Sequence, residues 1–256
     1  YAITQARRMG AHSFQQIVGF QKLEELQESI KDFSIRKRKD ECLDLPEKVY
    51  VKRYVELTTE QKQAYGAMKQ KALMVLNEEV FSTMNALTQI MRLQQVVAGS
   101  LRNEEGETIL LKNNRIRAVL DLLEETSGKV VIFAIFQTDI QELERAIAEK
   151  FGKKSVASYY GKTPQDDRQK TIDRFQDPDS ELRYFVSNPQ TGGRGITLTE
   201  ASTMIYYSNS YDLELRVQSE DRIHRIGQDK SCTYIDLVSK NTVDEKILQN
   251  LLSKVK

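Results

Sequence analysis

Hydrophobic residues follow two different periodicities along the chain, and the change falls near residue 100. In residues 61–91, apolar side chains recur every three or four positions, as they do along one side of an amphipathic helix. Thr58, Thr59 and Glu60 precede this stretch and offer an N-terminal cap. The pattern predicts one long helix or two helices joined end to end.

The first hundred residues contain little strand-like sequence, with one exception. In residues 48–57, Val49, Val51 and Tyr54 alternate with charged side chains. This alternation predicts a single exposed or edge strand within an otherwise helical region.

Beyond about residue 105, short β-branched or aromatic runs alternate with helical stretches. Such alternation predicts βαβ units, and therefore a parallel sheet with helices on both faces. We expect a mainly helical extension over residues 1–104 and an α/β lobe over residues 105–256. The predicted strands are 130–136, 156–160, 184–187, 204–207 and 233–238, and the predicted helices are 115–125, 139–150, 165–175, 213–226 and 243–254.

The composition is that of an ordinary soluble globular protein, with 39% hydrophobic and 29% charged residues. Since 38 basic residues balance 37 acidic ones, any basic nucleic-acid surface must be local. Cys42, Cys232, His12 and His224 lie far apart, so we expect no metal site. No apolar run approaches the roughly 20 residues of a membrane span, and no secretory signal is evident. The chain begins at Tyr1 rather than Met, so we expect a piece of a longer protein.

Ligands of parallel sheets commonly bind at the loops that follow the carboxyl ends of the strands. Three segments meet this condition: 137–138, 160–163 and 187–197. The Gly161, Lys162 and Thr163 run looks like the end of a Walker loop, but Val156 stands where the first glycine is required. We reject a Walker loop here, and the simplest alternative is a turn glycine beside a surface lysine.

Clustered glycines mark residues 187–201, which read SNPQTGGRGITLTEA. Glycines let backbone N–H groups approach a phosphate closely, because no Cβ intervenes. A flexible surface turn is the alternative, and the Thr191, Thr197 and Thr199 hydroxyls favour oxyanion contact slightly.

Arginines concentrate in residues 217–228, which read VQSEDRIHRIGQ. If this segment is helical, Gln218, Asp221, Arg222 and Arg225 share one face. The planar donor fork of arginine could stabilise a transferring γ-phosphoryl group. The alternative is a charged helical face held by an Asp–Arg pair.

Residues 31–40 carry a local excess of positive charge. Such a cluster can bind a phosphate backbone in a salt-dependent way, and a solvated face or an internal brace is equally consistent. The basic residues are Lys31, Arg36, Lys37, Arg38 and Lys39.

The order of these segments is more informative than any one of them. VVIFAIFQ, YYGKTPQDDRQKTIDRF, the glycine-rich segment and QSEDRIHRIGQDKSCTYIDLVSKNTVDEKI follow one another. This succession resembles the second RecA-like lobe of Swi/Snf-type members of helicase superfamily two, over about residues 31–256. The HRIGQ run, followed by a strand and a Thr-Val-Asp-Glu helix, carries most of the likeness. The resemblance implies a RecA-like parallel sheet preceded by a helical protrusion.

The resemblance also implies a DNA-dependent ATPase that translocates on duplex DNA, in which the first lobe holds ATP and Mg²⁺ and this lobe adds arginines. Its implied partners are duplex DNA and the first lobe of the same polypeptide. The implied catalytic residues are Arg222, Arg225 and Gln218; the nucleotide-side residues are Gly193, Gly195 and Asp221; and the nucleic-acid contacts are Gln137, Thr138, Lys162, Thr163, Arg168, Thr191, Arg36, Arg38 and Lys39.

The sequence contains neither a GxxxxGK[ST] loop nor an acidic Mg²⁺ motif. We therefore predict that this chain alone neither hydrolyses ATP nor holds a cofactor. Residues 208–212 lack the acidic-Trp-Asn-Pro run of many relatives, which favours a bacterial, archaeal or phage protein. We therefore expect a cytoplasmic protein associated with the nucleoid, or one in the host cytoplasm if a phage encodes it. The alternatives are a non-motor DNA- or protein-binding module and an unrelated nucleotide-binding α/β enzyme that uses the glycine loop directly.

Overall fold

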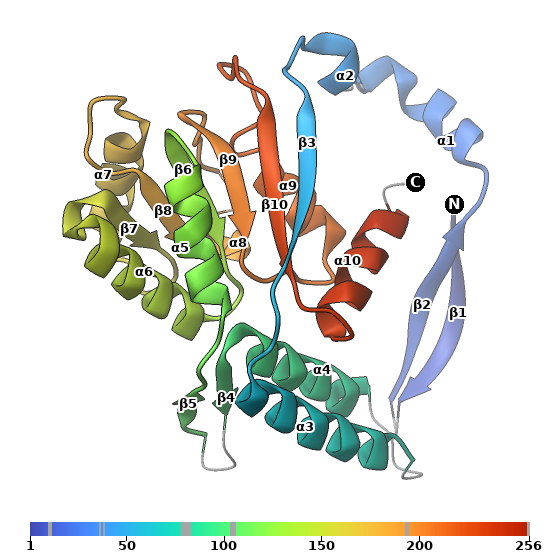
Figure 1. Cartoon of the computed structure of the whole chain (residues 1–256). Helices are drawn as coiled ribbons and strands as arrows, with labels where there is room; N and C mark the ends of the chain where they lie inside the picture. The colour runs from blue at the N-terminus through green and yellow to red at the C-terminus, as the bar shows by residue number, and fades with distance from the viewer. Residues whose placement is uncertain are drawn as a thin grey trace. The chain divides into compact units, whose positions relative to one another are not determined.

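The computed structural model describes residues 1–9, 12–35, 37, 39–77, 83–102, 106–192 and 195–254 (Figure 1). The chain forms two compact units, Tyr1–Asp44 and Leu45–Lys256, and each is described by itself. Within the described ranges, no helix combines the length and apolarity that crossing a membrane requires.

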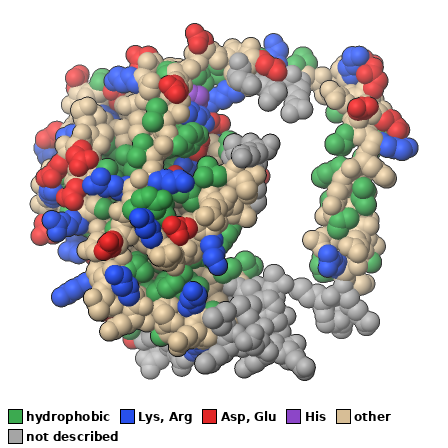
Figure 2. Space-filling model, turned by 45° about the vertical axis from the view of Figure 1, so that its right-hand side comes forward, with side chains coloured by type: hydrophobic (Ala, Val, Ile, Leu, Met, Phe, Trp, Pro, Cys, Tyr) green, Lys and Arg blue, Asp and Glu red, His purple; other side chains and the backbone are tan. Residues whose placement is uncertain are grey.

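The first unit begins with a β-hairpin, so the prediction of a helical start was wrong. β1 (Ala2–Met9) pairs antiparallel with β2 (His12–Phe20). Hydrophobic side chains such as Phe14, Ile17 and Phe20 lie exposed along the hairpin (Figure 2). The strands pair locally, from Met9 with His12 outward, and β-branched and aromatic residues of β2 such as Phe14, Ile17 and Phe20 favour a strand over a helix. The unit continues with α1 (Leu23–Ile30), the 3₁₀ helix η1 (Lys31–Phe33) and α2 (Lys39–Cys42).

The second unit is built on a six-stranded sheet in the order β3-β10-β9-β6-β8-β7, with every neighbouring pair parallel. This confirms the predicted parallel α/β fold and the predicted edge strand, because β3 lies at one edge. The strands are β3 (Lys48–Tyr54), β6 (Lys129–Phe133), β7 (Val156–Tyr159), β8 (Tyr184–Ser187), β9 (Ala201–Tyr206) and β10 (Cys232–Val238).

Helices cover both faces of this sheet (Figure 1). Val130 and Ile132 of β6 belong to the core that includes α5 and α6, whereas Val131 and Phe133 pack in the core with Phe175 of α7. Successive strand residues thus alternate between two hydrophobic layers, as a strand buried on both faces requires. These helices are α5 (Arg115–Glu125), α6 (Gln137–Phe151), α7 (Gln165–Gln176) and α9 (Leu213–Glu220).

A helical pair precedes the lobe, as the periodicity of residues 61–91 predicted. It consists of α3 (Thr59–Asn77) and α4 (Thr83–Ala98), and is followed by an unpredicted hairpin of β4 (Ser100–Arg102) and β5 (Thr108–Leu110). Val97 of α4 shares a small core with Val243, Ile247 and Leu251 of α10 (Val243–Lys254). The helical pair therefore packs on the lobe, and a domain boundary near residue 104 stays a prediction.

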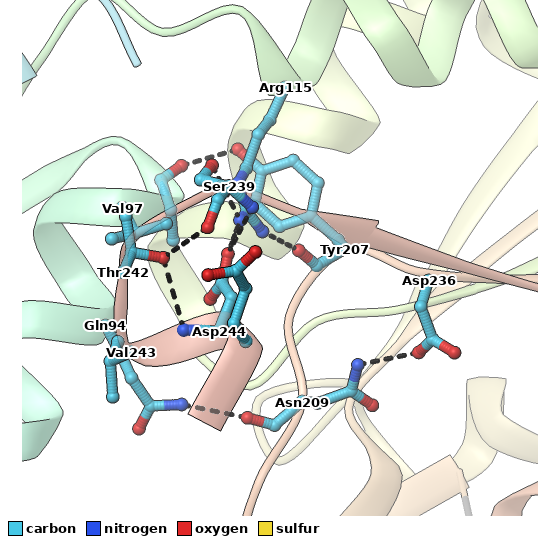
Figure 3. A network of polar contacts seen from close by, with 12 residues as sticks. Gln94, Val97, Arg115, Tyr207, Asn209, Asp236, Ser239, Thr242, Val243 and Asp244 are labelled. Atoms are coloured by element: carbon cyan, nitrogen blue, oxygen red, sulfur yellow. Dashed lines mark hydrogen bonds and ion pairs between the residues drawn. The ribbon is translucent and has the colours of Figure 1, made fainter. Parts of the chain in front are cut away.

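Polar contacts add to this packing at the carboxyl edge of the sheet (Figure 3). The Tyr207 hydroxyl donates to the Ala98 carbonyl at 2.6 Å, and Gln94 Nε2 donates to the Asn209 carbonyl at 2.8 Å. Arg115, which is 1% exposed, donates to the Tyr207 carbonyl and to Asp244. These bonds connect α4, α5, α10 and the ends of β9 and β10, so they fix the helical pair to the sheet.

Candidate functional site

The two candidate arginines lie on a turn, which we call the arginine turn (residues 221–227). α9 ends at Glu220, so the predicted helix over 213–226 was wrong beyond that residue. The Leu198 N–H bonds to the Arg222 carbonyl at 2.9 Å and takes the acceptor that a continuing helix would offer to residue 226. The helical pattern already changes before that point, because the Arg222 N–H bonds to the Ser219 carbonyl at 3.1 Å while the Gln218 carbonyl accepts from Arg222 Nε at 2.8 Å. Gln218, Asp221, Arg222 and Arg225 consequently do not form one helical face.

Both arginine side chains lie beside the end of the glycine-rich segment. Arg222 Nη1 donates to the Ile196 carbonyl at 3.2 Å, and Arg225 Nη1 donates to Thr197 Oγ1 at 3.0 Å. Arg222 is half-buried, whereas Arg225 is exposed. The fold therefore brings two segments that are separate in sequence into contact, with one guanidinium group reaching the surface.

The electrostatics of this pair favour an anion. Burial lowers the pKa of Arg222, the positive charge of Arg225 lowers it further, and Asp221 partly opposes both effects. Asp221 is also shared, because its carboxylate lies 3.7 Å from Lys48 Nζ. A phosphate oxygen between the two guanidinium groups would relieve their repulsion and receive charge-assisted hydrogen bonds.

Gln218 and the glycines take supporting positions around the arginines. The backbone carbonyl of Gln218 accepts from Arg222 Nε at 2.8 Å, while its side-chain amide donates to Glu214. Gly195 has a φ of +70°, and a Cβ there would meet no atom within 4 Å, so backbone conformation alone explains the glycine. Gly193, another predicted site residue, lies outside the described residues.

The arginine turn lies at the amino edge of the sheet, where the parallel strands begin, since it leads into β10 and adjoins the start of β9. The glycine-rich segment begins at the opposite edge, where α8 (Pro189–Gly192) follows β8. Because β8 and β9 run in the same direction, the segment must cross from one edge to the other. The expectation that all of residues 187–197 lie at the carboxyl edge was therefore wrong for their end.

The carboxyl edge holds several predicted nucleic-acid contacts. Gln137 is exposed and Thr138 is half-buried in the first turn of α6, and Lys162 is exposed after β7. Thr191, in α8, is half-buried, and its N–H bonds to the Asn188 side chain at 2.8 Å. These side chains follow different strands, and the parallel topology brings them to one edge.

Thr163 and Arg168 are engaged with the loop itself. Thr163 Oγ1 accepts from the Tyr160 N–H at 3.0 Å, and Arg168 Nε donates to the Thr163 carbonyl at 3.1 Å. The Arg168 guanidinium also lies over the Tyr159 ring, 5.8 Å from its centre. Both residues therefore shape the loop that presents Lys162.

The basic segment is described only in part. Lys39 begins α2 in the first unit, and Arg36 and Arg38 lie outside the described residues. Their assignment to nucleic-acid binding stays a prediction.

Sequence reasoning missed residues that hold the arginine turn from the side of β3. His224 Nε2 lies 2.8 Å from the Pro46 carbonyl oxygen, in the segment that leads into β3. Lys48 Nζ and Tyr50 Oη meet the Glu220 carboxylate at 3.1 and 2.8 Å. Lys48 begins the predicted strand 48–57, but the sequence does not show its partner, because the contact with Glu220 is set by tertiary structure.

The comparisons with known proteins agree with this arrangement. Residues 112–227 match the model of the helicase conserved C-terminal domain. The chain is 28% identical over 93% of its length to a SWI/SNF-related matrix-associated actin-dependent regulator of chromatin, subfamily A member 1, of Mus musculus, and covers 24% of that protein. It is 26% identical over 88% of its length to an uncharacterized ATP-dependent helicase of Mycoplasma genitalium, of which it covers 22%.

The structure of the Sulfolobus solfataricus SWI2/SNF2 ATPase core in complex with dsDNA matches with a TM-score of 0.66 and 26% identity. The match covers 91% of this chain and 50% of that one. The chain is a C-terminal RecA-like lobe of the Swi/Snf type. This Swi/Snf-type lobe spans about a quarter or less of the curated relatives named above.

Proposed function

We propose that this Swi/Snf-type lobe works within a longer ATP-dependent translocase on duplex DNA. In this proposal the first RecA-like lobe holds ATP and Mg²⁺, and the arginine turn faces the γ-phosphate across a cleft. The observation that carries the proposal is the placement of Arg222 and Arg225 on one turn, beside the glycine-rich segment.

Arg225 is the better candidate for direct phosphate contact. Its Nη1 bonds to Thr197, a neutral hydroxyl, and the side chain is exposed. Exchanging that bond for a charge-assisted bond to phosphate is favourable, and an arginine of this kind can contribute roughly 10³–10⁵ in rate. Arg222 is half-buried and bonded to two carbonyls, so we propose that it mainly holds the backbone on the side of the turn that would face the phosphate.

The residues present fit a triphosphate only in part. The guanidinium groups can donate to phosphate oxygens, while the sequence offers no Walker loop to hold the nucleotide and no acidic Mg²⁺ motif. ATP held by the first lobe would supply the phosphoanhydride bond, and this chain would stabilise the charge that develops on it.

DNA would lie at the opposite edge of the sheet. Gln137, Thr138, Lys162 and Thr191 would contact the phosphate backbone there, because exposed amides, hydroxyls and lysines position a strand without reading bases. The Sulfolobus solfataricus relative was solved with dsDNA, which supports duplex as the substrate. The glycine-rich segment crosses between this edge and the arginine turn, so it would link the DNA and nucleotide sites.

The proposal is tested by Arg225→Ala in the full-length protein. DNA-stimulated ATP hydrolysis should fall by roughly 10³-fold or more, because one wall of the phosphate site loses its charge. The affinity for duplex DNA should change little, since Arg225 lies at the other edge. Steady-state phosphate release and a DNA titration measure the two quantities.

Arg145→Ala is the matched control, because Arg145 is exposed on α6 and pairs with Glu142 and Glu149 of its own helix. It should leave both quantities unchanged. A loss of less than about tenfold in Arg225→Ala, which is some 1.4 kcal/mol of barrier, would contradict the assignment and favour a non-motor binding module.

A further inference from the structure

The arginine turn itself contains no regular secondary structure. α9 ends at Glu220, β10 begins at Cys232, and the residues between them form turns and bends. Ile223 is fully buried, but Ile226 is 72% exposed, so apolar packing holds only one side of the turn. The direction of Arg222 and Arg225 therefore depends on bonds from outside the turn.

Gln228 supplies such bonds from the interior, where it is 6% exposed. Its Nε2 lies 3.0 Å from the Thr199 carbonyl, 2.9 Å from that of Ala201 and 3.1 Å from that of Ile223. Its Oε1 accepts the Lys230 N–H at 3.0 Å. One carboxamide thus joins the glycine-rich segment, the arginine turn and the approach to β10.

The chemistry of this position requires a carboxamide. The carbonyl oxygens around Nε2 only accept hydrogen bonds, and the Lys230 N–H only donates. A methionine of similar length would leave these buried groups unpaired, and a carboxylate would face the carbonyls with negative charge.

We infer that Gln228 is a positioning residue for the arginine pair. It fixes the Ile223 carbonyl, between the two arginines in sequence, to the loop that Arg222 and Arg225 contact. Both guanidinium groups would then donate hydrogen bonds to the same anion from fixed positions. The inference rests on the proposed function, in which Gln228 itself does not contact the nucleotide.

The test uses the full-length protein with Gln228→Met, Arg225→Ala and the double variant. Gln228→Met should lower the kcat of DNA-stimulated ATP hydrolysis by about tenfold or more, with the KM for ATP and the Kd for DNA within about threefold. In the Arg225→Ala background, Gln228→Met should lower kcat by less than it does alone, because one of the two arginines that it positions is gone.

Gln176→Met is the matched control. Gln176 bonds to Thr199 Oγ1 and to the Glu200 N–H, so it anchors the same loop without touching the arginine turn. It should keep kcat within about twofold of the original protein. Equal losses in Gln176→Met and Gln228→Met would show that the loop merely needs stability, and would overturn the inference.

Gln228→Glu separates positioning from folding through its pH profile. The protonated carboxyl can still donate to a carbonyl, whereas the ionised form cannot. The kcat of this variant relative to the original protein should fall as pH rises, while the ratio for Gln228→Met stays flat. A flat ratio for Gln228→Glu, or an additive loss in the double variant, would overturn the inference. A harmless Arg225→Ala would instead refute the proposed function.

Discussion

At the scale of single residues, Asp139 shows what burial does to a charge in this fold. It lies in the first turn of α6, is 4% exposed, and its Oδ2 has no hydrogen-bond partner within the described part of the chain. Burial raises the pKa of the Asp139 carboxyl well above its usual value, and the positive charge of Arg115 opposes this in part. The folded protein therefore holds a proton here that the unfolded chain releases.

Asp139→Asn should remove a pH dependence of stability. Between the unfolded pKa near 3.8 and the raised folded pKa, the folded state binds more protons, so stability falls as pH rises through this window. The variant lacks this contribution, and its free energy of unfolding relative to the original protein should increase as the pH rises above the unfolded pKa near 3.8. Denaturant unfolding at several pH values measures it.

The exposed Asp166→Asn serves as the control, because it changes the same functional group without burial. Parallel pH profiles for the original protein and Asp139→Asn would show that Asp139 is ionised in the folded state.

The site residues also differ in how far the sequence alone could reveal them. Arg222 and Arg225 were found because the HRIGQ run and the order of the segments before it resemble the second lobe of Swi/Snf-type ATPases. Gln228 was missed, because a glutamine becomes informative only when the carbonyls around it are known.

At the scale of elements, hydrogen bonds between distant segments fix how helices and turns pack. The Leu198 N–H ties the arginine turn to the glycine-rich segment by bonding to the Arg222 carbonyl at 2.9 Å. The helical pair is attached to the sheet partly through the Tyr207 hydroxyl, which donates to the Ala98 carbonyl at 2.6 Å.

Tyr207→Phe should destabilise the second unit by about 1–3 kcal/mol, because the buried Ala98 carbonyl loses its partner. The free energy of unfolding in denaturant measures this loss. Tyr160→Phe is the matched control, since its hydroxyl accepts a longer bond, from Gln141 Nε2 at 3.3 Å, in a part-buried position. Similar effects for the two variants would mean that the Tyr207 hydroxyl does not hold the helical pair.

At the scale of the whole molecule, the proposed function gives this lobe one wall of a nucleotide site that needs two. We predict that residues 1–256 alone show no DNA-stimulated ATP hydrolysis, because the arginines stabilise charge but neither hold the nucleotide nor bind Mg²⁺. Phosphate release with saturating duplex DNA measures this, and the full-length protein serves as the positive control. Turnover by the isolated chain would favour an enzyme that uses the glycine loop directly.

The sequence by itself determined the parallel α/β lobe, the edge strand, the helical pair and the candidate arginines. Those features rest on local periodicity, turn chemistry and motif order, which can be read along a single stretch of chain. Tertiary structure decided the partners of the arginine turn, the crossing of the glycine-rich segment between sheet edges and the role of Gln228. Each of these depends on hydrogen bonds between residues that are separate along the chain, so no local pattern encodes it.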